Sequence, residues 1–461
     1  MTTTTPVIAG FYPDPSICRV GDDYYLATSS FEYFPGVPLF HSRDLIHWEQ
    51  LGNILDRPSQ LEIGIGASRG IYAPTLRFHD GRFWLVTTNV SQAKGQLIVT
   101  AEDPRGPWTD PVFVEDAGGI DPDLAWDLDG RCYLTWTTSA GIMQASVDPV
   151  AGILLEEPRR MWSGTGLQYP EAPHLYHREG WWYLLIAEGG TERGHSVSIA
   201  RSRSITGPFE GAPGNPIFSH RSTREPIQNV GHSDLVELPD GTWAAVFLGV
   251  RARGGTPLFH TNGRETFLAG ITWSDGWPTY DESRYDVAAV DHSFTDDLAG
   301  LHPRWISPDA NPSELVKDGQ LLPGGLLAVR ARDEAWSFSV TVAPSNFRQV
   351  LRLDDRHWCS LDLSPDRVVA RLRIGPLEQE LASAPVTGPV TLRITAKEPT
   401  FGGPDDIELG FITGTTYKEL TRFDGRYLST EVAGGFTGRT LGLQSLAEAT
   451  TIHEVTYTSR T

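Results

Sequence analysis

The chain has 461 residues, a formal net charge of -20 at pH 7 and a pI of about 5.0. A chain of this length predicts two domains, each with enough residues to bury a core of its own. The large negative charge argues against nucleic acids and anionic membranes as partners, because both would repel the protein.

The N-terminal segment and the cysteines indicate a compartment. Residues 1–6 contain no basic start, apolar run or cleavage site of the kind that marks a secretory signal. No later stretch is long and apolar enough to span a bilayer. The three cysteines, Cys18, Cys132 and Cys359, are scattered and odd in number, which is not typical of a disulfide framework. We therefore expect a cytoplasmic protein.

Short aromatic segments recur along the first half of the chain, at residues 21–25, 80–84, 129–133, 179–183 and 240–243. In each, a turn pair precedes alternating aromatic and aliphatic residues, which predicts a hairpin that leads into a half-buried strand. Their final aromatics follow one another at intervals of about 50 to 60 residues, a period typical of propeller blades: Tyr25, Trp84, Tyr133, Tyr183 and Trp243. The sequence thus predicts a five-bladed β-propeller.

A second set of side chains stands eleven or twelve residues before these aromatics: Asp14, Tyr72, Asp121, Glu171 and His232. If the blades superpose, these residues occupy equivalent places on the innermost strands, which surround the propeller axis. Prolines beside the carboxylates fix the backbone where these strands begin. We expect the five side chains to meet in one pocket.

The carboxylates among them, Asp14, Asp121 and Glu171, indicate acid-base chemistry. An Asp-Pro pair taken alone is usually a turn or a cap, but three carboxylates at one repeat position are not expected from turns alone. Carboxylates gathered in a narrow pocket repel one another, so the pKa of at least one rises and an acid and a base can coexist near neutral pH. Hydrolysis of a glycosidic bond needs such a pair.

The pattern changes after about residue 291. Turn clusters then separate short alternating stretches such as residues 338–342, 368–372 and 390–394, which is typical of an antiparallel β-sandwich. The sequence predicts an all-β protein with a propeller at residues 1–291 and a β-sandwich at residues 292–461. The second domain could be an independent sugar-binding module or a lid over the propeller pocket, and we favour the lid.

The chain closely resembles the family 43 glycoside hydrolases, in the branch of β-xylosidases and α-L-arabinofuranosidases that carry a C-terminal β-sandwich. The resemblance rests on residues 10–16, 30–37, 73–77, 169–174 and 263–267. It implies a concanavalin-like sandwich and an inverting, single-displacement mechanism. It also implies that Asp14 is the general base, Glu171 the general acid, and Asp121 the carboxylate that positions the acid and adjusts its pKa.

The same resemblance implies a substrate-binding set of Phe31, Tyr72, His232, Arg264 and Phe436. Arg264 would contact sugar hydroxyls, although a structural salt bridge is its alternative role. Phe31 and Tyr72 would form walls, and Tyr72 stands where many relatives have Trp, so the shape of that wall differs. Phe436 follows paired glycines that permit close backbone approach, and its alternative place is the sandwich core.

His232 resembles the family histidine at the floor of the site, where some relatives hold Ca²⁺ or water. A buried histidine bonded to backbone is the alternative, and imidazole is a poor ligand for a hard cation. We expect no required cofactor and leave an ion near His232 open.

These inferences predict an exo-acting hydrolase that releases terminal xylose or arabinofuranose from short oligosaccharides, with no nucleic-acid or membrane partner. The sequence does not separate the two pentoses, and it gives no oligomeric state. A non-catalytic propeller that binds a carbohydrate or a protein is the main alternative. A retaining fructan hydrolase is a further one, although residues 12–16 do not match its signatures.

Overall fold

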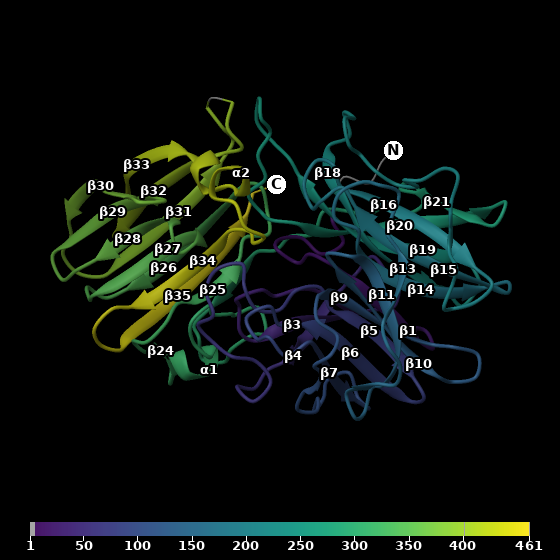
Figure 1. Cartoon of the computed structure of the whole chain (residues 1–461). Helices are drawn as coiled ribbons and strands as arrows, with labels where there is room; N and C mark the ends of the chain where they lie inside the picture. Colours follow the sequence, from purple (N-terminus) through teal and green to yellow (C-terminus); the bar gives the residue numbers. More distant parts are fainter. Residues whose placement is uncertain (1–4, 401, 461) are drawn as a thin grey trace.

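A computed structural model describes residues 5–400 and 402–460, which form two β-rich domains side by side (Figure 1). The first domain, purple to teal, consists of small antiparallel sheets arranged around a centre. The second, green to yellow, consists of two larger sheets. Within the described residues, no helix has the length and apolar character needed to cross a membrane.

The first domain is a five-bladed propeller, as the repeat predicts, and each blade is one antiparallel sheet built in chain order. Blade 1 comprises β1 (Ser16–Val20), β2 (Asp23–Ala27), β3 (Gly36–Ser42) and β4 (Glu49–Leu55). Blade 2 comprises β5 (Thr75–His79), β6 (Arg82–Thr88), β7 (Gln96–Ala101) and β8 (Val112–Val114). Blade 3 comprises β9 (Ile120–Trp126), β10 (Cys132–Thr138), β11 (Gly141–Asp148), β12 (Ile153–Leu154) and β13 (Arg159–Trp162).

The last two blades follow the same plan. Blade 4 comprises β14 (Glu171–Arg178), β15 (Trp181–Glu188), β16 (Ser196–Ser202) and β17 (Glu210–Gly211). Blade 5 comprises β18 (Ile227–Glu237), β19 (Trp243–Arg251), β20 (Glu265–Ser274) and β21 (Trp277–Asp281). The first strand of each blade contacts the first strands of both neighbouring blades, and β1 meets β18 to close the ring.

The five hairpin segments join the first and second strands of their blades, and their final aromatics all lie on second strands. The blades pack against one another through apolar side chains. Tyr183, on β15 of blade 4, and Trp243, on β19 of blade 5, belong to one such cluster. The repeated aromatic residues therefore contribute to the packing between blades.

The propeller closes through a short segment that precedes β1. Ile8 forms an antiparallel bridge with Thr266 on β20, and each backbone nitrogen donates to the other carbonyl, at 3.2 and 3.3 Å. The Tyr12 nitrogen donates to the Arg264 carbonyl nearby. The first described residues thus bind the last blade, which brings the segment of Asp14 next to that of Arg264.

The second domain is a β-sandwich of an eight-stranded and a six-stranded sheet. The eight-stranded sheet comprises β22 (Phe294–Asp296), β23 (Val316–Lys317), β24 (Gln320–Leu321), β26 (Trp336–Val342), β31 (Val390–Lys397), β32 (Asp406–Thr413), β33 (Thr416–Asp424) and β35 (Thr450–Ser459). The six-stranded sheet comprises β25 (Leu327–Arg330), β27 (Phe347–Asp354), β28 (His357–Leu363), β29 (Arg367–Ile374), β30 (Leu377–Pro385) and β34 (Thr440–Ser445). Three single-turn helices complete it: α1 (Pro312–Leu315), η1 (Gly425–Leu428) and α2 (Thr430–Ala433).

Alternation of side chains builds the sandwich core. On β26, Phe338, Val340 and Val342 are buried, whereas Ser339 and Thr341 between them are partly exposed. The apolar faces of both sheets meet in one continuous cluster. This period of two is what the sequence shows in residues 338–342.

A separate apolar cluster joins the two domains. Phe11, Phe31 and Tyr33 of the propeller pack against four sandwich residues: Ile306, Leu326, Ala328 and Val350. Beside it, the backbones of Phe34 and Ser307 exchange two hydrogen bonds of 2.8 Å. Because Phe31 belongs to both this cluster and the predicted site, the interface positions the sandwich over the propeller centre.

Candidate active site

The eight predicted site residues all line one small cavity of about 80 Å³ at the mouth of the propeller, here called the inner well. The carboxylates Asp14, Asp121 and Glu171 are there, with the five predicted substrate-binding residues: Phe31, Tyr72, His232, Arg264 and Phe436. Segments as distant as residues 14 and 436 therefore converge, as the repeat alignment predicts for the propeller part.

The five repeat-related residues do not all lie on the innermost strands, in contrast to the prediction. Asp121, Glu171 and His232 lie on β9, β14 and β18, but Asp14 precedes β1 and Tyr72 precedes β5. In blades 1 and 2 strand pairing begins later, so the same distance from the hairpin falls on the connecting segment.

A left-handed backbone directs several of these side chains. The φ angles of Asp14, Asp121 and His232 are +56°, +53° and +46°, and that of Phe31 is +49°. Residues other than glycine rarely adopt this conformation, and such strain gathers at functional sites. Prolines at 13, 15 and 122 indicate a stiff backbone here, but no sequence pattern reveals the sign of φ.

Asp14 is a buried carboxylate held in its ionised form. Arg264 Nη1 donates to Asp14 Oδ1 at 2.9 Å, and Ser29 Oγ donates to Asp14 Oδ2 at 2.5 Å. Burial alone raises the pKa of Asp14, but Arg264 and the Ser29 hydrogen bond outweigh burial and hold that pKa below 3.8. Asp14 is therefore charged at neutral pH and able to accept a proton.

Asp121 has the opposite electrostatic environment. Burial raises its pKa well above 3.8, and repulsion from Glu171 and Asp14 raises it further. A single backbone donor, the Ala172 nitrogen at 3.2 Å from Asp121 Oδ2, only partly offsets these effects. Asp121, beside Glu171, thus retains its proton to higher pH than an ordinary aspartate would.

His195 also contacts this pair, and sequence reasoning missed it. His195 Nδ1 lies 2.9 Å from the Asn229 carbonyl oxygen and so must carry the proton of the neutral ring. The other nitrogen, Nε2, is buried without a hydrogen-bond partner and lies 3.6 Å from Glu171 Oε1. In this tautomer the lone pair of Nε2 faces the Glu171 carboxyl group. His195 precedes β16, outside every repeated pattern.

Arg264 connects the carboxylates to the aromatic wall. Besides Asp14, its guanidinium donates to Thr191 Oγ1 at 3.0 Å and to the Phe436 carbonyl at 3.4 Å. It lies 5.6 Å from the ring centres of both Phe31 and Phe436. Arg264 is therefore part of the site, in contrast to the alternative of a surface salt bridge. Thr191 lines the well as well, and no sequence signal marked it.

Phe436 reaches the well from the sandwich and is not a core residue. Its ring stacks on Phe31 and meets Tyr72 edge-on, both at 5.8 Å between ring centres. The preceding Gly434 and Gly435 have φ of +74° and +82°, which glycine adopts without strain. The Phe436 nitrogen donates to Ser68 Oγ of the propeller at 2.9 Å. The sandwich thus supplies one wall of the well.

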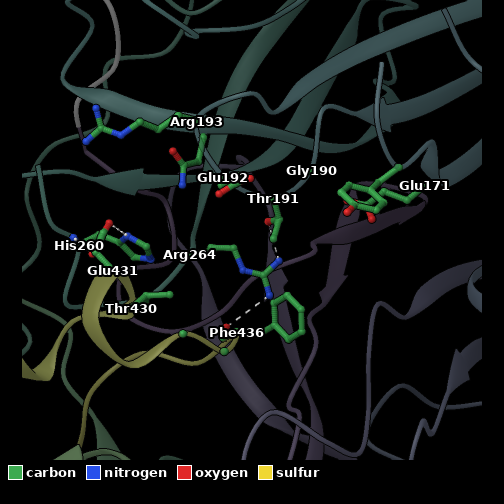
Figure 2. Close-up of a pocket in the computed structure, with 14 residues that line it drawn as sticks. Glu171, Gly190, Thr191, Glu192, Arg193, His260, Arg264, Thr430, Glu431 and Phe436 are labelled. Atoms are coloured by element: carbon green, nitrogen blue, oxygen red, sulfur yellow. Dashed lines mark hydrogen bonds and ion pairs between the residues drawn. The ribbon is translucent and has the colours of Figure 1, made fainter. Parts of the chain in front are cut away.

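The inner well opens into a larger cavity of about 610 Å³, here called the outer chamber (Figure 2). Glu171, Thr191, Arg264 and Phe436 line both cavities. Both domains form the chamber, and its far side holds a hydrogen bond between them, in which Glu431 Oε1 accepts from His260 Nδ1 at 2.7 Å. The small inner well lies beside the carboxylates, and the larger outer chamber lies next to it. This arrangement suits an elongated ligand that places only its end in the inner well.

His232 at the inner well does not fit a calcium ion held by protein ligands. Burial lowers its pKa to about 4, although Asp14 and Glu171 act to raise it, so the ring is neutral. Ca²⁺ takes about six to eight oxygen ligands, whereas the neighbours acting on His232 include the imidazoles of His174 and His195. Within residues 5–400 and 402–460, no group of three or more His, Cys, Asp or Glu side chains is arranged to hold a metal.

Comparison with known proteins agrees with this geometry. Residues 3–278 match Glycosyl hydrolases family 43. A xylosidase/arabinosidase of Butyrivibrio fibrisolvens is 48% identical over 59% of this chain and 55% of that protein. A non-reducing end α-L-arabinofuranosidase of Bacteroides ovatus is 36% identical over 96% of this chain and 91% of that protein.

Solved structures extend the likeness to the sandwich. GH43B of the Bacteroides ovatus xyloglucan locus superposes with a TM-score of 0.90 at 33% identity, over 100% of both chains. A xylan β-1,4-xylosidase of Bacillus halodurans gives a TM-score of 0.88 at 29% identity, over 99% of both chains. Both domains and their mutual arrangement are thus found in these structures.

Proposed function

Because this chain belongs to glycosyl hydrolase family 43, we propose that it is an exo-acting, inverting β-xylosidase, α-L-arabinofuranosidase or both, which releases terminal pentoses from xylo- and arabino-oligosaccharides. The observation that carries the proposal is that the pKa values of two carboxyl groups in one well are shifted in opposite directions. Asp14 is held ionised, whereas Asp121, beside Glu171, keeps its proton to higher pH than an ordinary aspartate. A charged and a protonated carboxyl group therefore coexist in one well.

Asp14 is the general base in this proposal. Its ionised carboxylate takes a proton from a water molecule, and that water attacks the anomeric carbon of the terminal sugar. Arg264 and Ser29 fix both carboxylate oxygens, so the base keeps its position while the sugar enters. In an inverting reaction the base never bonds to the sugar, which suits a carboxylate whose oxygens are already engaged.

Glu171 is the general acid. It lies at the junction of the inner well and the outer chamber, where the bond between the terminal sugar and the rest of the chain would be placed. It gives its proton to the leaving oxygen as the bond breaks. The backbone of its neighbour Ala172 is tied to Asp121, and the neutral His195 faces its carboxyl group, so both residues position the acid.

The exo mode follows from the shape of the site. Phe436 closes the sandwich side of the inner well, and the carboxylates and His232 close its base. The outer chamber adjoins the well at four shared lining residues, so in this proposal a substrate enters from the chamber and its terminal residue reaches Asp14. Phe31, Tyr72 and Phe436 offer apolar faces to that sugar. The relatives' names include both xylose- and arabinose-specific activities, and this proposal keeps both.

Kinetics of two variants on aryl β-xylosides and aryl α-L-arabinofuranosides test the roles. Asp14→Ala should lower turnover on every substrate by about 10² to 10⁴-fold, because the water is left unactivated. Glu171→Ala should lose a similar factor on poor leaving groups and little on good ones, which need no proton. Asp116→Ala, an exposed carboxylate, serves as the control. Equal losses on good and poor leaving groups in both variants would show that the roles are misassigned.

Two product assays test the mode. Proton NMR should show the inverted anomer as the first product, and a retained anomer would exclude single displacement. Polymeric xylan should keep its viscosity while pentose accumulates, because internal bonds cannot enter the inner well. Rapid viscosity loss at low sugar release would contradict the exo proposal.

A further inference from the structure

A second cavity, on the interface between the domains but outside the active site, gathers positive charge. It has a volume of about 350 Å³ and shares no lining residue with the inner well or the outer chamber. Three arginines line it, Arg304, Arg330 and Arg332, and Asp291 is the single carboxylate among its described lining residues. In a chain with a net charge of -20, such a concentration of guanidinium groups is unusual. We call this cavity the arginine pocket.

Arg330 is the central observation. It ends β25, is 3% exposed, and its three guanidinium nitrogens are all buried without a hydrogen-bond partner. Its contacts are aromatic: the guanidinium carbon lies 4.5 Å from the Tyr12 ring centre and 5.7 Å from that of Phe11. Burying an unpaired charge is costly, so buried charges in proteins are normally paired.

Other buried arginines of this chain follow that rule. Within the described residues, the arginines buried to a similar degree each meet a carboxylate: Arg264 with Asp14, Arg352 with Glu32 and Asp355, and Arg439 with Asp405. Arg330 has no such partner anywhere in the part of the chain that the structure describes. The charge of Arg330 is therefore not neutralised by any carboxylate of the described residues and adds to the positive potential of the pocket.

The neighbouring arginines, Arg304 and Arg332, also make few hydrogen bonds and ion pairs with the described residues. The Arg304 guanidinium stacks on the Phe294 ring at 4.1 Å and has neither an ion pair nor a hydrogen bond with any described residue. Arg332 Nε donates to the Ala9 carbonyl at 3.1 Å, which leaves its terminal nitrogens for a ligand. Burial and the charges of Arg304 and Arg332 lower the pKa of His302, which also lines the pocket, and the charge of Asp296 only partly offsets them. The positive charge of the pocket thus also acts on His302.

We propose that the arginine pocket binds a phosphoryl group, carried either by inorganic phosphate or by a phosphorylated sugar. A doubly charged tetrahedral oxyanion accepts hydrogen bonds from several directions, which Arg304 and Arg332 can supply, while the buried Arg330 adds positive charge behind them. The cavity is larger than phosphate alone requires, and the partly exposed Trp48 lines its wall with the buried rings of Tyr12 and Phe40. An exposed aromatic surface such as that of Trp48 suits a sugar ring attached to the phosphate.

Occupancy of this pocket joins elements of both domains. Tyr12 and Trp48 belong to the propeller, whereas Arg304 and Arg330 belong to the sandwich. A bound anion would therefore link them directly, and it would stabilise the folded two-domain protein by mass action. The Tyr12 ring under Arg330 lies two residues before Asp14 in the chain, so the ligand would sit behind the segment that carries the base.

Isothermal titration calorimetry at constant ionic strength and pH 8 tests the proposal. The full chain is titrated with sodium phosphate, glucose 6-phosphate and glucose, and melting temperatures are recorded with and without each. Wild type should bind both phosphates saturably and melt at a higher temperature in their presence. Glucose should produce neither effect. Tighter binding of glucose 6-phosphate than of phosphate identifies a phosphorylated sugar, and equal affinities identify free phosphate.

Variants locate the binding. Arg304→Gln, at a partly exposed position that should fold normally, is expected to weaken phosphate about tenfold or more, because it removes a charge-assisted donor. Arg221→Gln, an exposed arginine that lines none of the three cavities, should bind phosphate like wild type. Hydrolysis of aryl glycosides in the absence of phosphate should be the same in both variants. Absence of saturable binding to wild type by about 10 mM, or equal binding by Arg304→Gln and wild type, would overturn the proposal.

Discussion

Substitution of Gly263 by alanine tests whether close contact between the domains holds Phe436 in the active site. Gly263 has φ of +79°, and an added Cβ would lie 2.9 Å from Gly438 Cα and 3.0 Å from Phe11 Cδ2. Gly438 follows Phe436 by two residues on the sandwich loop, and Gly263 directly precedes Arg264. The new methyl group would therefore push backbone against backbone where the two domains meet.

Two effects set the size of the penalty. The left-handed conformation costs an L-residue about 1–2 kcal/mol, and an extra methyl group in a packed contact costs about 1–3 kcal/mol. Gly81 offers a matched control, because its φ is +73° and a Cβ there would meet nothing within 4 Å. We expect Gly81→Ala to lose about 1–2 kcal/mol of unfolding free energy and Gly263→Ala about 2–5 kcal/mol.

Activity should separate the two variants more clearly. Displacing Phe436 from Phe31 and Tyr72 removes the wall that Phe436 offers to the terminal sugar in the proposed function. Loss of one aromatic contact with the sugar, worth about 0.5–1.5 kcal/mol, would lower kcat/KM about twofold to thirteenfold. The assay is thermal unfolding followed by tryptophan fluorescence, together with initial rates on an aryl β-xyloside. Gly81→Ala should keep wild-type kcat/KM. If Gly263→Ala matched Gly81→Ala in both measurements, the inferred contact would not position Phe436.

Two further variants test the electrostatics of the site. Arg264→Gln removes the charge that holds the pKa of Asp14 below 3.8. That pKa therefore rises, and because the base acts when ionised, the acid limb of the pH profile of kcat/KM should move to higher pH; an unmoved limb would contradict the assignment of Asp14 as the base. His195→Phe removes the lone pair that faces Glu171, so rates should fall more for poor than for good leaving groups, and a uniform loss would indicate a purely structural role for His195.

The propeller was predictable because its signals are local. A turn pair followed by an aromatic residue specifies a hairpin wherever it occurs, and Tyr25, Trp84 and Tyr133 all lie on the second strands of their blades. Equal spacing then placed Asp121 and Glu171 at one cavity without any structural information. The alternation of residues 338–342 similarly predicted a sandwich strand, because a strand turns successive side chains to opposite faces of its sheet.

Other features of the site depend on contacts that leave no repeat. His195 and Thr191 lie on the loop between β15 and β16, from which His195 meets Glu171 and Thr191 meets Arg264. The positive φ of Asp14 and Asp121 is a torsion that spacing cannot reveal. Phe436 was predicted through family resemblance alone, since a phenylalanine in a β-rich domain is usually part of the core.

The bridge between Ile8 and Thr266 has a consequence for synthesis on the ribosome. The first blades are synthesised long before β20, so until then the ring of blades cannot close. Blade 1 lacks its contact with blade 5 during that time. Asp14 meets its arginine only after roughly 250 further residues have been made, since the two are 250 positions apart. The active site therefore forms late in synthesis. Until then, the exposed edge strands of the blades are sites at which the chain can aggregate.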